Sequence, residues 1–129
     1  MSLLAALLFA LTPEAPYLAP YLTAAAEVEG ANPRYVDCIK LIEEDVEIGR
    51  IAAQQWALEG GGPAAQHCLA IADIAAGFPR LGAVRLMTLS DRPQAGDATA
   101  RARIKAEAAL AFLDAGASDF AEEALIGAL

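Results

Sequence analysis

Aromatic and β-branched residues are scarce in this sequence of 129 residues. Aromatic side chains make up 6% of it although 57% of the residues are hydrophobic, because alanine and leucine supply most of the apolar content. No run alternates apolar and polar residues with the period of two that a half-buried strand requires. Alanine and leucine are strong helix formers, whereas β-branched and aromatic residues favour strands. The composition therefore argues against a sheet protein and predicts an all-α fold.

Basic residues are also few, at 9 against 17 acidic ones, and the formal net charge is −8. Binding to nucleic-acid phosphates requires clustered lysine and arginine. The densest basic stretch, residues 101–105, is followed two residues later by Glu107, a pattern typical of a solvated helix face. We therefore expect no nucleic-acid partner.

Groups that could carry out catalysis are nearly absent. The chain has one histidine and two cysteines, and no nucleophile motif, phosphate-binding loop or dinucleotide fingerprint. His67 and Cys68 are adjacent, so on a helix their side chains diverge by about 100° and cannot easily bind one metal ion. The acidic cluster at residues 43–47 is typical of a helix cap beside a solvated surface. We expect no catalytic residue, no metal, no cofactor and no enzymatic activity.

The two cysteines, Cys38 and Cys68, are too few for a disulfide framework. A bond between them would tie two helices together across 30 residues and would contribute roughly 3–4 kcal/mol. Alternatively, both are small buried hydrophobic residues, and a reducing cytosol would keep them free. Both interpretations stay open at this point.

The N-terminal segment, residues 1–31, differs from the rest. Residues 3–11 are all apolar, which is too short for a bilayer span of about 20 residues but suits the core of a signal peptide. No basic residue precedes them, so a helix packed on the body is the alternative. Four prolines within residues 12–33 predict a linker or short broken helices. Export to a periplasm is favoured if residues 1–15 act as a signal, and a cytoplasmic location otherwise.

From residue 32 to 129, caps, prolines and glycines divide the chain into six helices joined by short turns, which predicts antiparallel hairpins. The expected helices begin at Pro33, after Asp45, at Pro63, at Pro79, after Asp97 and at Ser118; they end near Glu43, Leu58, Gly77, the loop at 91–96, Gly116 and Leu129. The third, residues 64–76, is apolar on nearly every side, so we expect it to be buried between neighbours.

Small and large residues recur at fixed points of the last two hairpins. In the final one these are Ala109, Phe112, Gly116, Ala121, Leu125 and Ala128, and in the preceding one Leu69, Ala70, Gly77, Gly82 and Leu86. The order resembles the tetratricopeptide repeat (TPR), a helix–turn–helix of 34 residues. Asp73 occupies a point where an aromatic residue is usual, and Gly77 and Gly116 lie 39 residues apart, which indicates an insertion near Pro93. Residues 56–68 are also similar to bacterial proteins of this kind.

The resemblance implies a TPR-like α-solenoid of two to three repeats, with a concave groove formed mainly by the first helix of each pair. The groove positions that it implies are His67, Ile71, Ile74, Arg103, Leu110 and Leu113. Such a surface suits a peptide or helix from a partner, so the expected function is a protein–protein interaction or scaffold module. The alternative is an assembly subunit that acts by self-association. We expect the apolar face of the last helix to be covered by self-association, by residues 3–11 or by further sequence.

Overall fold

The computed structural model describes residues 32–129 and is helical throughout that range, with no strand in it. The elements are α3 (Pro33–Glu44), α4 (Val46–Leu58), α5 (Gly62–Ala75), α6 (Pro79–Ser90), the 3₁₀ turn η2 (Pro93–Ala95), α7 (Ala98–Asp114) and α8 (Ser118–Ala128). The all-α prediction is confirmed. The expected roles of residues 1–31 lie outside the described residues.

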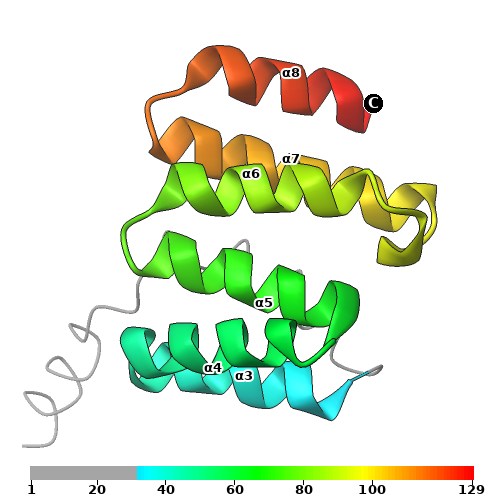
Figure 1. Cartoon of the computed structure of the whole chain (residues 1–129). Helices are drawn as coiled ribbons and strands as arrows, with labels where there is room; N and C mark the ends of the chain where they lie inside the picture. The colour runs from blue at the N-terminus through cyan, green and yellow to red at the C-terminus, as the bar shows by residue number, and fades with distance from the viewer. Residues whose placement is uncertain (1–31) are drawn as a thin grey trace, which may run out of the picture.

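The helices form a stack in chain order, with α3 and α8 at opposite ends (Figure 1). α3 packs on both α4 and α5, and from α4 onward each helix packs on the next one along the chain. This arrangement is a series of antiparallel neighbours joined by short connections, as the punctuation of the sequence predicts. α5 lies inside the stack, and its residues 67–74 are buried without interruption, as expected for a helix that is apolar on nearly every side.

Side-chain caps set the start of three helices. The Asn32 side chain accepts a hydrogen bond from the backbone N–H of Arg34 at 3.1 Å, and Asp45 accepts from Ile48 at 3.1 Å. Asp97 accepts from the N–H of Ala100 at 2.8 Å. Each cap satisfies a backbone donor that the first helical turn leaves unpaired. The expected starts are therefore confirmed here, whereas α5 begins at Gly62, one residue before the expected Pro63.

Three of the turns share one backbone pattern. Gly60, Gly77 and Gly116 have φ values of 84°, 92° and 71°, and the residue after each glycine donates to a carbonyl five positions earlier. This is the Schellman ending of a helix, which requires a left-handed residue and therefore favours glycine. The same turn thus follows α4, α5 and α7. It makes the α5–α6 and α7–α8 hairpins equivalent in their turn geometry.

The α6–α7 connection differs, because it runs from Asp91 to Asp97 and contains η2. Arg101 on α7 holds it closed, since its Nε donates to the backbone oxygen of Ser90 at 2.7 Å. This longer connection lies where the sequence places an insertion. It accounts for the separation of 39 residues between the two equivalent turns.

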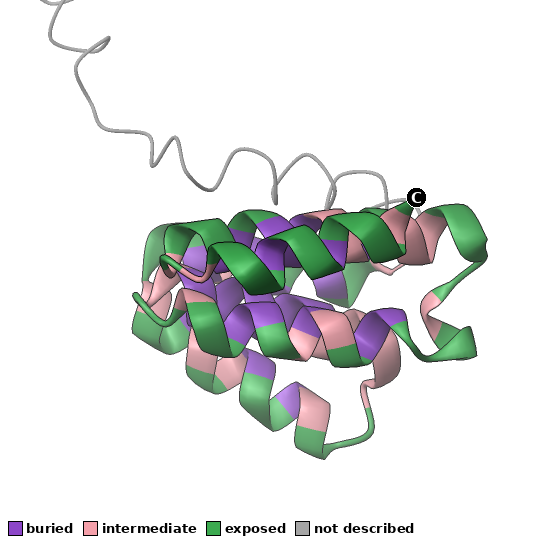
Figure 2. Ribbon diagram, turned by 90° about the horizontal axis from the view of Figure 1, so that it is seen from above, coloured by how far each residue is buried: buried purple, intermediate pink, exposed green. Residues whose placement is uncertain are grey.

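Alanine is the most frequent residue type in the buried core, and larger side chains such as Ile71 and Phe112 fill the space between the helices. Figure 2 shows the buried positions on the helices. Ala70 on α5 and Gly82 on α6 mark a close crossing of two helices. A Cβ atom added at Gly82 would lie 2.7 Å from the Ala70 carbonyl oxygen and 2.4 Å from Cγ1 of Ile74. Real Cβ atoms do not approach so closely, so a side chain at residue 82 would force the two helices apart.

The variant Gly82→Ala should therefore be less stable than the wild type. Overpacking costs about 1–3 kcal/mol, which outweighs the gain of up to about 1 kcal/mol in helix propensity. Gly127→Ala is the matched control, because its added Cβ would make only an ordinary contact, 3.6 Å from Lys105 Cδ. Urea denaturation should show a lower midpoint for Gly82→Ala and an unchanged or higher one for Gly127→Ala. Equal midpoints would contradict the close crossing.

Candidate functional site

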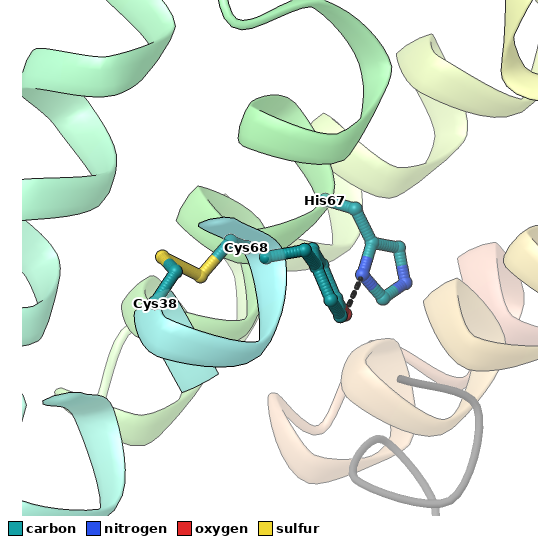
Figure 3. The surroundings of a disulfide bond; sticks show 4 residues. Cys38, His67 and Cys68 are labelled. Atoms are coloured by element: carbon teal, nitrogen blue, oxygen red, sulfur yellow. Dashed lines mark hydrogen bonds between the residues drawn. A yellow bond between two sulfur atoms is a disulfide. The ribbon is translucent and has the colours of Figure 1, made fainter. Parts of the chain in front are cut away.

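A disulfide between Cys38 and Cys68 links α3 to α5 (Figure 3). The two Cα atoms lie 6.5 Å apart, and both side chains are buried. The sequence left open whether the two cysteines are bonded or free, and in the structure they are bonded. The link closes a loop that includes all of α4, so it restricts the unfolded chain as well as the packing of the first three helices.

A buried hydrogen-bonded chain continues from the same place. The hydroxyl of Tyr35 lies 2.6 Å from Nδ1 of His67, the bond drawn as a dashed line in Figure 3, and Nε2 of His67 lies 2.7 Å from Oε2 of Glu107. An ionised carboxylate only accepts, so with Glu107 ionised Nε2 carries a hydrogen, and in the neutral imidazole Nδ1 then accepts from the Tyr35 hydroxyl. The chain joins α3, α5 and α7. Because all three side chains are buried, it connects helices and is closed to substrates.

The environment of Tyr35 affects its ionisation. Burial raises the pKa of the Tyr35 hydroxyl above its usual value, and the nearby negative charge of Glu107 raises it further. The neutral phenol is therefore the form that the fold requires. Ionisation of this group would place a negative charge in a site that cannot solvate it.

A second buried polar group joins α4, α5 and α6. Asp73 on α5 is 1% exposed, and its two carboxylate oxygens accept from Nε of Arg50 on α4 at 2.9 Å and from Nε of Arg85 on α6 at 2.6 Å. The Arg50 guanidinium also lies over the ring of Phe78, 4.7 Å from its centroid. The two arginines thus pair the buried charge of Asp73 inside the stack.

An apolar hollow of about 610 Å³ lies beside Phe78 at the α5–α6 turn, and we call it the Phe78 hollow. It is lined by Gly77, Phe78, Pro79, Arg80, Leu81, Val84 and Ala115. Phe78 is 49% exposed, Val84 49% and Leu81 41%. Nearby, Arg80 lies over the ring of Phe120, 5.3 Å from its centroid, and Phe120 stacks on the buried Phe112. The hollow therefore lies where the ends of the two equivalent hairpins meet.

The six expected groove residues do not form one surface. His67, Ile71 and Ile74 are buried in the core, whereas Arg103, Leu110 and Leu113 on α7 are exposed. A partner could reach the first three only if the helices repacked, so the α5 half of that prediction is wrong. α5 packs against α3, α4 and α6, and its residues 67–74 are all buried.

Most of the small and large residues that carry the predicted repeat pattern lie between helices or in turns. Ala70, Ala109, Phe112 and Ala121 are buried between helices, and Gly77 and Gly116 make the turns, whereas Leu125 is 48% exposed. The sequence analysis did not predict the Phe78 hollow, because its residues occupy ordinary turn and helix positions. The available signal was an aromatic residue beside a turn, in the order Gly77-Phe78-Pro79, in a chain with few aromatics.

Comparison with known proteins adds no identification, since no family model, no curated protein and no solved structure matches the chain. Within residues 32–129, no cluster of histidine, cysteine, aspartate and glutamate could hold a metal ion. No helix in the same range is long and apolar enough to cross a membrane. The resemblance to the tetratricopeptide repeat thus stays a prediction that rests on the residues quoted above.

The raised pKa of Tyr35 predicts a specific loss of stability in alkali. The unfolded state releases this proton near pH 10 while the folded state retains it, so the free energy of unfolding should fall as pH rises above about 10, by up to about 1.4 kcal/mol per unit. Tyr35→Phe should lack this component, at a cost of about 1–3 kcal/mol at pH 7 because Nδ1 of His67 loses its partner. Urea unfolding at pH 7–11 measures both, and groups common to the two proteins cancel. Parallel pH profiles would contradict the prediction.

Removal of the disulfide should also destabilise the chain. The double variant Cys38→Ala/Cys68→Ala should lose about 3–4 kcal/mol, the value expected for closing a loop of this length. Dithiothreitol should lower the urea midpoint of the wild type and leave that of the double variant unchanged. If the fully reduced wild type has the same urea midpoint as the disulfide-bonded protein, the link is not a source of stability.

Proposed function

We propose that this chain is a protein–protein interaction module and that the Phe78 hollow is its docking surface. The observation that supports this most directly is the exposure of Phe78, Leu81 and Val84 side by side on one hollow. Single exposed apolar residues are ordinary, but contiguous ones in a hollow are typical of sites that bind another molecule. Covering them would remove apolar surface from water, which is favourable by about 25 cal/mol per Å².

The chemistry of the lining favours binding over catalysis. The one ionisable side chain among the lining residues is Arg80, whose guanidinium group has five N–H donors and no acceptor. General acid–base or nucleophilic catalysis needs at least one group that can exchange a proton or attack a substrate. The buried Tyr35–His67–Glu107 chain has such groups, but no substrate can contact them. A peptide or helix from a partner protein fits the hollow best.

We further propose that the α5–α6 and α7–α8 hairpins are two TPR-like units. Their turns share the same hydrogen bonds and left-handed glycine, and small residues occupy the places where each pair of helices approaches closely. In this arrangement the Phe78 hollow lies at the turn end of the two units, away from the groove that the resemblance implies. The chain would act as a scaffold by holding the α5–α6 and α7–α8 turns at a fixed distance and orientation to each other.

Self-association is the second candidate, and the surface of α8 favours it. Leu125 and Ile126 on this helix are 48% and 64% exposed, and α8 packs on α7. A second copy that covered these side chains would bury apolar surface on both chains. This function would depend on α8 and would not require the Phe78 hollow.

The variant Val84→Asp tests the docking surface. Peptides of 12 random residues are selected on the full chain, and their affinities are measured by fluorescence anisotropy. A carboxylate within the apolar lining should weaken binding at least about tenfold, or 1.4 kcal/mol. Ile48→Asp on α4 is the matched control, since Ile48 is 55% exposed and outside the hollow. It should bind within about twofold of the wild type, and surface changes of this kind alter stability by only about 0.5 kcal/mol.

The opposite pattern, with binding lost in Ile48→Asp and kept in Val84→Asp, would move the docking surface to α4. Failure to select any peptide, together with a mass by light scattering that rises with concentration, would favour the self-association candidate. In that case Ile126→Asp should restore a constant mass, because it places a charge in the apolar face of α8.

A further inference from the structure

Two arginines lie at the Phe78 hollow, and a third shares the Asp73 carboxylate with one of them. Arg50 lies over Phe78 itself, Arg80 belongs to the lining and lies over Phe120, and Arg85 follows the lining residue Val84 on α6. The chain has nine basic residues and a net charge of −8. Arg50, Arg80 and Arg85 are thus a third of its basic residues.

The local charges do not cancel. Arg50 and Arg85 both pair with the single carboxylate of Asp73, and each does so through Nε. Asp73 is the one carboxylate that forms an ion pair with either arginine among residues 32–129. Arg80 makes no ion pair within the same range, and its neighbour across the hollow, Phe120, is neutral. The three guanidinium groups and the Asp73 carboxylate therefore carry a net positive charge between them.

Asp73 also fixes the geometry of this cluster. Because its buried carboxylate accepts one bond from each arginine, the two guanidinium groups are held beside each other at the edge of the hollow. Preformed donors cost less conformational entropy when a ligand binds. Guanidinium groups bind carboxylates well, because their paired N–H donors match the two oxygens.

We infer that the partner segment which docks in the Phe78 hollow is acidic as well as apolar. One of its apolar side chains packs on Phe78, Leu81 and Val84, and neighbouring aspartate or glutamate side chains accept hydrogen bonds from Arg50, Arg80 and Arg85. This inference rests on the proposed function and adds the chemistry of the partner. A segment bearing lysine or arginine at the same points is disfavoured, because it meets three like charges.

The observations favour a short acidic peptide over a nucleic acid. A polyanion extends far beyond the cluster, where the chain carries an excess of acidic residues that would repel it. An acidic protein segment needs to place only two or three carboxylates next to an apolar side chain. The hollow offers donors at its edge and apolar contacts within it, which matches that composition.

The composition of the peptides selected on the full chain is the first test. They should be enriched in aspartate or glutamate beside leucine, phenylalanine or another large apolar residue, and their affinity should fall as salt concentration rises. Arg50 and Arg85 are left intact, because their loss would leave Asp73 buried without a partner.

Arg80→Gln is the second test. It should weaken the selected peptides about threefold to tenfold, between the values for an exposed ion pair and a charge-assisted hydrogen bond. Arg92→Gln is the matched control, since it makes the same change of net charge in the exposed α6–α7 connection. It should bind as the wild type does.

The outcomes separate this inference from the proposed function. If the selected peptides show no acidic enrichment and Arg80→Gln binds them as the wild type does, while Val84→Asp does not, the charge inference is overturned and the docking surface stands. If Val84→Asp binds as well as the wild type, both fall. If the mass of the chain rises with concentration and Arg80→Gln prevents this, the occupant is a second copy, and the separate acidic partner is overturned.

Discussion

The pairing of Asp73 with two arginines is the constraint on which both the packing and the surface depend. A carboxylate that is 1% exposed would destabilise the fold by several kcal/mol if it were unpaired, so α4 and α6 must each bring an arginine to α5. This requirement sets how the three helices face one another. It also places Arg50 over Phe78, so the same buried group positions a side chain at the edge of the hollow.

Alanine-rich packing explains why such polar contacts matter here. Alanine side chains let helices approach closely, but they offer few interlocking shapes to define a unique alignment. Directional hydrogen bonds supply that definition. One set joins α3, α5 and α7 through Tyr35, His67 and Glu107, and the other joins α4, α5 and α6 through Asp73. α5 belongs to both sets and to the disulfide, so the order of the whole stack is fixed around it.

Local signals explain what the sequence could predict. Caps such as Asp45 and Asp97 and turn glycines such as Gly77 act within a few residues, so the helix boundaries follow from the chain itself. The facing of α5 could not be predicted in this way, because a helix that is apolar on nearly every side has no preferred outer face. Ile71 is buried because the neighbouring helices pack against α5. The partners of Asp73 lie 23 and 12 residues away, and no local pattern connects them.

The distribution of aromatic residues links the core to the proposed docking surface. Alanines fill the close crossings, so the interior between residues 32 and 129 needs few rings, and it holds Tyr35, Trp56 and Phe112. Phe78 and Phe120 are instead 49% and 48% exposed, and an arginine lies over each. Aromatic side chains and arginine are enriched at protein interfaces. Because the two rings are held at the turn ends of equivalent hairpins, a partner would meet them in a fixed relation and would lose little entropy on binding.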